Sequence, residues 1–124
     1  RCDKFEISQA WVNKSEHGQF HHIHVHPNSF ISGIYYFDKV SPTYFQDPRQ
    51  LVLSTGFNVE CDGDNPVWEY SPTANTLLLF PSWLSHFTMP HALNEQRYTL
   101  AINVIPTGVV NQGSLTELNI RPSS

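Results

Sequence analysis

Hydrophobic and polar positions alternate along this chain in short runs, and these runs predict strands rather than helices. No stretch of ten or more residues keeps the apolar repeat of an amphipathic helix. The apolar runs are rich in aromatic and β-branched residues, and proline, glycine and asparagine separate them. The strands predicted from this pattern cover residues 5–13, 20–26, 32–37, 51–53, 75–80, 83–88, 97–105 and 116–120.

The segments between these strands are predicted to be turns and loops. Residues 14–18 and the dipeptide Pro27-Asn28 carry turn residues, and residues 38–50 contain two prolines and predict a loop. Residues 55–71 have a mixed pattern with a turn cluster at 61–66, whose aspartates lack the spacing of a calcium-binding loop. Many short strands joined by turns indicate an all-β fold with few or no helices, either a sandwich or a barrel.

Length and composition favour one globular domain. The chain has 124 residues, which is enough for a single core, and 40% of them are hydrophobic. We therefore expect residues 1–124 to form one domain, N-terminally trimmed because the chain starts at Arg1 rather than at methionine. Cys2 and Cys61 are expected to be free thiols, since the sequence shows no secretory signal.

Charge and hydropathy narrow the classes of partner. A net charge of −4 with only seven lysines and arginines argues against a nucleic-acid-binding surface. No run of 18 apolar residues is present, so no membrane span is expected, and without a signal-peptide pattern the expected location is the cytoplasm. Small molecules and peptides remain as expected substrates, and the oligomeric state is left open.

Histidine is the unusual polar residue of this sequence. The seven histidines equal the lysines and arginines together, and four of them lie within residues 21–26. On a strand, alternate side chains share a face, so His22, His24 and His26 are expected to line a cavity. His21 and the apolar residues between them are expected to point the other way. Because imidazole is a common metal ligand at neutral pH, this face predicts a metal site.

Two residues in the second half of the chain extend this hypothesis. His86 lies in the apolar stretch 80–86, about sixty residues beyond the histidine cluster. Arg97 opens the apolar strand 97–105. A guanidinium group on a buried strand requires an anion, because an unpaired buried charge is costly.

The order of these residues resembles the iron(II)- and 2-oxoglutarate-dependent oxygenases, which carry a His-x-Asp/Glu motif, a distant histidine and then Arg-x-Ser/Thr. Here the corresponding segments are His24-Val25-His26, His86 and Arg97-Tyr98-Thr99. The following Tyr35-Tyr36 strand resembles the prolyl-hydroxylase-like branch, and the whole pattern resembles small 2-oxoglutarate oxygenases of phages and marine bacteria. The resemblance covers residues 11–105 and implies a double-stranded β-helix, a jelly-roll or cupin-like barrel.

This resemblance implies a 2-oxoglutarate-dependent non-haem iron dioxygenase with Fe(II), 2-oxoglutarate and O2 as cofactors. The implied reaction hydroxylates an unactivated C–H bond and decarboxylates 2-oxoglutarate to succinate. The implied catalytic and metal-binding residues are His24, His26 and His86, and those implied for the cosubstrate are Arg97, Thr99 and Tyr36. Arg97 would bind the distal carboxylate with its bidentate fork, and the two hydroxyl groups would contact the same carboxylate.

One departure from the family pattern leaves the ligand set open. The family's second ligand is a carboxylate, whereas this chain has His26, so the site has one negative charge fewer. His22 in place of His26, or a loop carboxylate from Asp38 or Glu16, remains an alternative. Asn103 either lines the pocket or is a core amide.

Other readings of the same residues stay open. The aromatic residues either wall the pocket or, for most of them, belong to the core: Trp11, Phe20, Tyr35, Phe80 and Trp83. A cupin-like three-histidine dioxygenase or isomerase would bind metal without 2-oxoglutarate. A structural or ligand-binding jelly-roll would need neither. The sequence does not identify the substrate.

Overall fold

The computed structural model describes residues 2–38, 41–49, 67–92 and 94–121. Every regular element within these residues is a β-strand, so the all-β class expected from the sequence is confirmed. They are β1 (Lys4–Ser15), β2 (Ile31–Tyr36), β3 (Thr43–Gln46), β4 (Val67–Tyr70), β5 (Thr76–Pro81), β6 (His86–Thr88), β7 (Arg97–Val110) and β8 (Leu118–Ile120).

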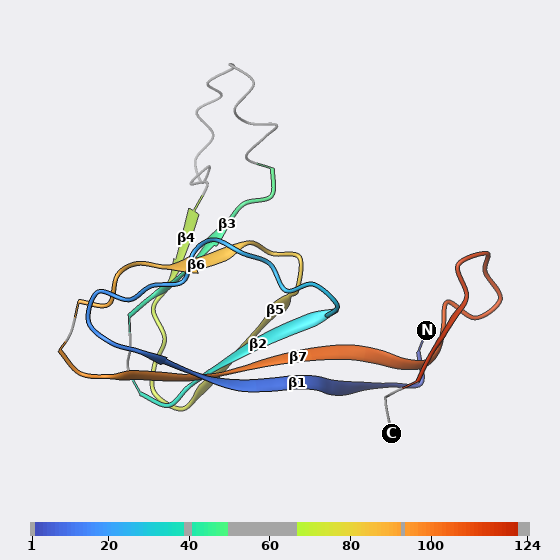
Figure 1. Ribbon diagram of the computed structural model, residues 1–124. Coiled ribbons are helices and arrows are strands. Elements are labelled where there is room, and N and C mark those ends of the chain that lie inside the picture. Colours follow the sequence, from blue (N-terminus) through green and yellow to red (C-terminus); the bar gives the residue numbers. More distant parts are fainter. Residues whose placement is uncertain (1, 39–40, 50–66, 93, 122–124) are drawn as a thin grey trace, which may run out of the picture.

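The strands form two antiparallel sheets (Figure 1). The larger sheet has the order β1-β7-β2-β5, and β8 pairs with the far end of β7. The smaller sheet has the order β4-β3-β6 and lies opposite the larger one. In the larger sheet β1, β7, β2 and β5 are distant in sequence from their neighbours, as in the double-stranded β-helix that the sequence led us to expect. The histidine segment 20–26 runs beside β6 at the rim between the sheets.

The inner face of the larger sheet is mostly polar. Side chains of a strand alternate between two faces, and the buried positions at the start of β7 are Arg97, Thr99, Ala101 and Asn103. The strand register places Ser15 of β1 opposite Arg97 and Tyr36 of β2 opposite Thr99. The two long strands therefore carry polar side chains into the space between the sheets.

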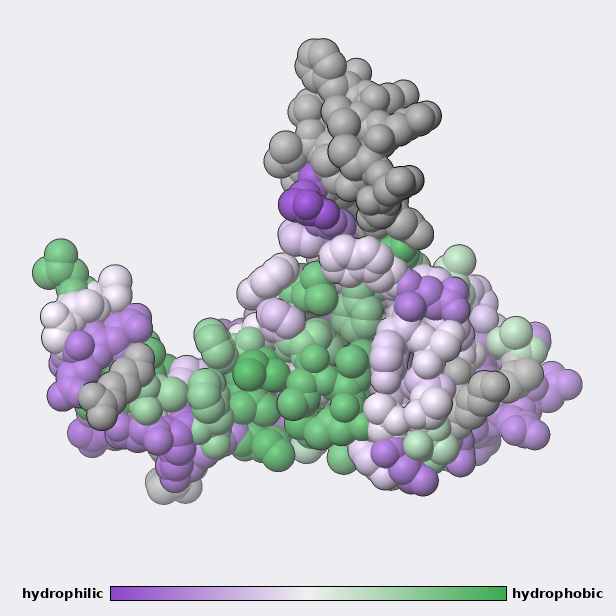
Figure 2. Space-filling view, turned by 180° about the vertical axis from the view of Figure 1, so that it is seen from behind, coloured by the Kyte–Doolittle hydropathy of each residue, from purple (hydrophilic) through white to green (hydrophobic). Residues whose placement is uncertain are grey.

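The outer face of the same sheet is apolar. Ile7 and Val12 of β1 and Leu77 and Leu79 of β5 are about half exposed or more. Figure 2 shows apolar surface gathered across the middle of the molecule, seen from behind. Antiparallel sheets usually place apolar residues inward and polar residues outward. This sheet reverses that arrangement, which indicates that its inner face holds a site rather than a plain hydrophobic core.

Several predicted elements differ from the structure. Residues 20–26 are not a regular strand: they meet β6 through a single bridge between His24 and His86, and Ile23 and Val25 are exposed. The predicted loop 38–50 contains β3, and the mixed segment 55–71 ends in β4. Of the predicted strand 83–88 only the last three residues are a strand. Isolated sequence patterns do not show which short segments find a pairing partner.

The ends of the other strands agree more closely with prediction. β7 extends beyond the predicted 97–105 to Val110, where it pairs with β8. Cys2 is a free thiol, whereas Cys61, the predicted strand 51–53 and the turn cluster 61–66 lie outside the described residues. In the described part of the chain no helix has the length and apolarity needed to cross a bilayer.

Candidate active site

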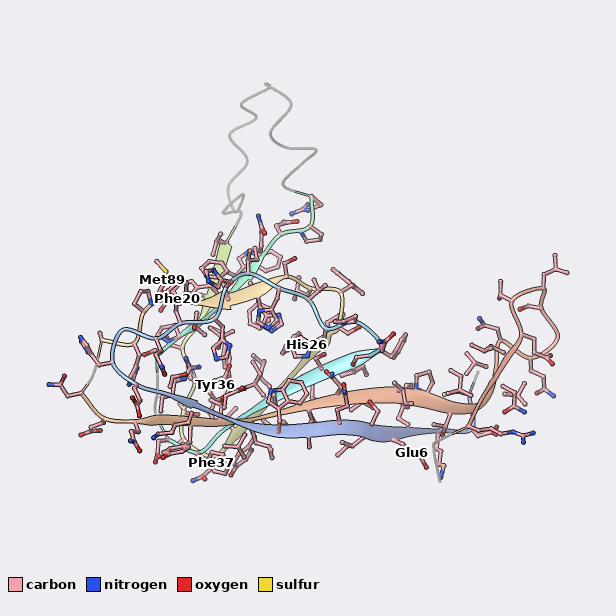
Figure 3. All side chains as sticks on the ribbon, viewed as in Figure 1. Glu6, Phe20, His26, Tyr36, Phe37 and Met89 are labelled. Carbon is pink, nitrogen blue, oxygen red and sulfur yellow. The ribbon has the colours of Figure 1, made fainter. Side chains whose placement is uncertain are left out.

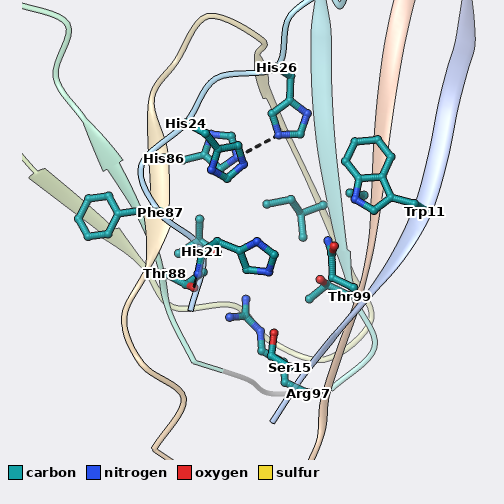
Figure 4. A pocket seen from close by; sticks show the side chains of 14 residues that line it. Trp11, Ser15, His21, His24, His26, His86, Phe87, Thr88, Arg97 and Thr99 are labelled. Atoms are coloured by element: carbon teal, nitrogen blue, oxygen red, sulfur yellow. Dashed lines mark hydrogen bonds between the residues drawn. The ribbon is translucent and has the colours of Figure 1, made fainter. Parts of the chain in front are cut away.

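Three histidines converge at the rim between the sheets (Figure 4). The backbones of His24 and His86 exchange two hydrogen bonds of 3.0 Å, which fixes these residues opposite each other. The backbone N–H of His26 donates to Ser82 O at 3.0 Å, so the segment stays alongside the connection into β6. Ring nitrogens of the three histidines lie within 4.8 Å of one another.

Hydrogen bonds orient all three rings. Each Nδ1 lies close to a carbonyl oxygen: 2.6 Å from His22 O for His24, 2.8 Å from Asn103 Oδ1 for His26 and 3.1 Å from Leu84 O for His86. A carbonyl oxygen can only accept, so each Nδ1 carries the proton and each Nε2 keeps a free lone pair. This is the arrangement by which proteins orient metal-binding histidines.

The amide of Asn103 is itself held in place. Its Oδ1 accepts from Ser32 Oγ at 3.1 Å and its Nδ2 donates to Gln9 Oε1 at 2.9 Å. Since Nδ2 is used by Gln9, the oxygen must face His26. Asn103 is only 4% exposed and acts as a core amide that orients His26, which decides between the two roles left open by the sequence.

The convergent lone pairs suit a metal ion. The Nε2 atoms of His26 and His86 are 3.2 Å apart, and as two acceptors they cannot hydrogen-bond each other. Two imidazoles on one divalent ion, each at about 2 Å from it, have nitrogens roughly 3 Å apart. The residues therefore fit a metal ion, held by three neutral ligands that leave further coordination positions free.

Burial favours the neutral form of His86 and His26. His86 is 4% exposed, and its pKa is lowered from 6.5 to about 4, mainly by burial and also by the positive charges of His24, His26 and His21, although the hydrogen bond to Leu84 O opposes the shift. Burial also lowers the pKa of His26, although the hydrogen bond to Asn103 opposes this shift. A neutral imidazole is the form that binds metal.

The lowered pKa of His86 predicts how the metal-free protein responds to acid. Between pH 6.5 and about 4 the unfolded chain binds a proton at this position and the folded chain does not. Stability is therefore fully present above pH 6.5 and is lost as the pH falls towards 4, by up to roughly 3 kcal/mol at about 1.36 kcal/mol per pKa unit. Thermal unfolding of the metal-free protein over this range measures the loss. The stability of His86→Phe is expected to fall less over this pH range. An equally steep fall would contradict the assignment of this pH dependence to His86.

A buried cation lies at the other end of the same cavity. The Arg97 side chain is 6% exposed, and its Nε is buried without a hydrogen-bond partner. None of the ion pairs in the described residues involves Arg97, and burial lowers its pKa. Because a buried guanidinium without an anion is unstable, this end of the cavity is a site for an anion.

Hydroxyl-bearing residues lie on the strands next to Arg97, and of these Ser15 and Thr99 line the cavity, whereas Tyr36 is not part of its lining. Tyr36 is fully buried, and its hydroxyl lies 2.8 Å from Thr43 Oγ1. Thr99 follows Arg97 on the same face of β7, and Ser15 lies opposite Arg97 on β1. Burial raises the pKa of Tyr36, so its phenol keeps the proton that it can donate. The metal-binding and anion-binding ends share one cavity of about 70 Å³.

The structure does not bring the alternative ligands into the site. The His22 side chain is exposed, and only its backbone carbonyl contacts His24. Glu16 pairs with Lys14 at 2.9 Å on the surface, and Asp38 is exposed. His21, which the strand alternation placed on the opposite face, lines the cavity instead. That expectation was wrong because residues 20–23 are not a regular strand, so their side chains do not alternate strictly.

Aromatic residues take different roles around the cavity. Trp11 lines it and stacks on His26 with ring centroids 5.7 Å apart. Phe80 is buried against His86, with centroids 4.8 Å apart. Phe20 and Trp83 are exposed, and the hydroxyl of Tyr35 donates to Asn75 Oδ1 at 3.0 Å. Figure 3 places Phe20 near Met89, away from His26.

The sequence analysis missed the polar residues that β1 and the small sheet add to the cavity. These are Asn13, Ser15, Thr43 and Thr88. The polar side chains at alternate positions near the end of β1 were a usable signal, because they continue the face of Trp11. Thr88 also had a signal, since it lies two residues beyond His86 in the predicted strand and so shares its face. Thr43 gave none, because β3 lies in a segment whose prolines predicted a loop.

Comparison with known proteins agrees with this geometry. The family model described as "Putative 2OG-Fe(II) oxygenase" matches residues 9–103. No curated protein sequence matches the chain. Among solved structures, an oxidoreductase of the 2OG-Fe(II) oxygenase family from Burkholderia pseudomallei has a TM-score of 0.62 at 14% identity, covering 84% of this chain and 46% of that one.

Two further solved structures have the same fold. HygX from Streptomyces hygroscopicus, with nickel and 2-oxoglutarate bound, has a TM-score of 0.63 at 10% identity, covering 83% of this chain and 58% of that one. A Pseudomonas putida prolyl-4-hydroxylase has a TM-score of 0.59 at 16% identity, covering 86% of this chain and 54% of that one. These likenesses show a double-stranded β-helix. The chain spans about half the length of these structures.

Proposed function

This chain belongs to the 2OG-Fe(II) oxygenase family, and from that premise we propose that it is a 2-oxoglutarate-dependent dioxygenase that hydroxylates an unactivated C–H bond, as prolyl hydroxylases do. One observation carries the proposal. A single cavity holds three histidine rings with converging nitrogens at one end and, at the other, a buried Arg97 without an anionic partner among the described residues. A ligand with a metal-chelating end and a distal carboxylate satisfies both ends.

We assign the metal to His24, His26 and His86, with His26 in the position where the family pattern has a carboxylate. The hydrogen bond from Nδ1 of His26 to Asn103 supports this assignment, because it points Nε2 towards His86. The chemistry that iron(II) supplies when bound is oxygen activation, coupled to oxidative decarboxylation of 2-oxoglutarate to succinate and CO2. The protein contributes neutral ligands, which leave this site one negative charge poorer than a two-histidine, one-carboxylate site.

We assign the distal carboxylate of 2-oxoglutarate to Arg97. The planar fork of a guanidinium matches a carboxylate in two parallel hydrogen bonds. The hydroxyl group of Thr99 lines that end of the cavity and is proposed as a further donor. Tyr36 is assigned to the same carboxylate from the resemblance, although it is not part of the cavity lining and its hydroxyl contacts Thr43 Oγ1. Trp11 and Phe80 pack against the metal-binding rings and limit the access of water. The substrate is proposed to be a small molecule or a peptide, bound by residues 1–124 as one domain.

A succinate-release assay tests this function. Purified protein with iron(II), 2-oxoglutarate and oxygen is expected to form succinate, faster when a candidate substrate is added, and to form none without iron. Prolyl peptides and free amino acids are the first substrates to screen. Failure to bind 2-oxoglutarate by the metal-loaded protein would contradict the proposal.

The three-imidazole ligand set also suits a second function, that of a cupin-like metal enzyme without 2-oxoglutarate. Such an enzyme would bind the metal equally well. A buried guanidinium without an anionic partner opposite the metal has no role in such an enzyme. Binding of 2-oxoglutarate therefore distinguishes the two functions.

A further inference from the structure

A fourth histidine points into the cavity between its two ends. The ring of His21 lies between the metal-binding histidines and Arg97 (Figure 4). Its centroid is 6.3 Å from that of His24. Burial lowers the pKa of His21, and the positive charges of His24 and Arg97 lower it further.

The backbone of His21 is fixed, whereas its ring is free. The His21 N–H donates to Thr88 Oγ1 at 2.9 Å, and the Thr88 N–H donates to His21 O at 3.1 Å. These bonds hold the residue against the end of β6 whatever its side chain is. Within the residues that the structure describes, neither ring nitrogen of His21 forms a hydrogen bond.

This free ring distinguishes His21 from the metal-binding histidines. Each of those has its Nδ1 on a carbonyl oxygen, and His21 has no such anchor and lies outside the converging group. Because buried polar groups are normally hydrogen-bonded, a half-buried ring nitrogen without a partner is a candidate hydrogen-bonding group for a ligand. In the same cavity, the Nε of Arg97 is buried without a hydrogen-bond partner. Two unpartnered donors thus face the same space.

We propose that His21 and Arg97 together bind the distal carboxylate of the cosubstrate, so that the site selects dianionic 2-oxoacids over monoanionic ones. This inference rests on the proposed function. A carboxylate has two oxygens with about four acceptor positions, so the guanidinium fork leaves room for an imidazole N–H. A monoanionic 2-oxoacid of the same length would leave both donors desolvated and unpaired, which disfavours its binding.

Calorimetric titration of the nickel(II)-loaded protein tests this role without turnover. The two ligands are 2-oxoglutarate and 2-oxopentanoate, which has the same carbon chain but no distal carboxylate. We expect His21→Ala to weaken 2-oxoglutarate binding by roughly tenfold to a hundredfold, the effect of a hydrogen bond to a charged group. Binding of 2-oxopentanoate should change less than about twofold, because that ligand lacks the group that His21 contacts.

Two matched variants complete the design. His22→Ala removes the neighbouring exposed histidine and should leave both affinities unchanged. His21→Gln keeps an N–H donor and should recover part of the lost affinity. Nickel content, measured for every variant, should equal that of the unmodified protein, because His21 is not a ligand.

The outcomes separate this inference from the function on which it rests. An equal loss for both acids would show that His21 contacts the metal-binding end, and unchanged 2-oxoglutarate affinity would show that it contacts neither. Either result overturns the inference and leaves the oxygenase assignment standing, provided that Arg97→Ala still weakens 2-oxoglutarate binding. If the unmodified protein does not bind 2-oxoglutarate, both proposals fail together.

Discussion

Arg97→Ala is expected to abolish succinate formation from 2-oxoglutarate while leaving the metal bound. The substitution removes the buried cation that we assign to the distal carboxylate, and it leaves that carboxylate desolvated and unpaired. Loss of one partner from a buried charge pair costs about 2–5 kcal/mol, which corresponds to at least a thirtyfold weaker affinity for the cosubstrate. Succinate release at saturating iron(II), together with metal content, measures the two expectations separately.

Arg97→Lys serves as the matched control for charge. A lysine keeps one positive charge but loses the planar fork, so we expect partial activity that is recovered at high 2-oxoglutarate concentration. Turnover equal to that of the unmodified protein in Arg97→Ala would show that the carboxylate binds elsewhere.

His86→Ala is expected to lose the metal while keeping the β-sheet circular dichroism. Loss of a residue that only hydrogen-bonds to a metal ligand already lowers metal affinity by about 10–100-fold. Removal of one of the three ligands should therefore lower it by more than that. Elemental analysis after gel filtration measures the bound metal. Stoichiometric metal in this variant would mean that the ligand set is wrong.

The packing of His86 calls for a second variant. Its ring contacts Phe45 and Phe80, with centroids 5.9 and 4.8 Å away, so alanine also leaves a cavity. His86→Phe keeps an aromatic ring in this position and removes only the lone pair. It should lose the metal as His86→Ala does, with a smaller loss of stability. His22→Ala should keep the metal, since its ring is exposed.

The local pattern of the chain predicted the long elements better than the short ones. β7 was predicted over 97–105 because this run is rich in apolar and β-branched residues and no proline or glycine interrupts it, and the structure extends it only at its end. β3 was missed because Pro42 and Pro48 flank it. Its four residues are held by pairing with β4 and β6, and no local signal reports such a distant partner.

The candidate site follows the same division. The types and order of its residues, His24-x-His26, His86 and Arg97-x-Thr99, are visible in the sequence and were sufficient to suggest the oxygenase family. Their separation in space was not visible. The sequence also gave no means of choosing among His22, His26 and the loop carboxylates. The choice depends on the Asn103 amide, 77 residues beyond His26.

The sequence by itself determined the all-β class, because apolar side chains at short alternating intervals can be buried only by strands. It also determined which residues are chemically able to hold a metal and an anion. Tertiary structure alone decided that three rings share one point, that Asn103 orients His26, and that His21 faces the cavity. These features depend on pairing between segments that are distant in sequence. Where the backbone is not a regular strand, that pairing and not the alternation of side chains decides which way each side chain points.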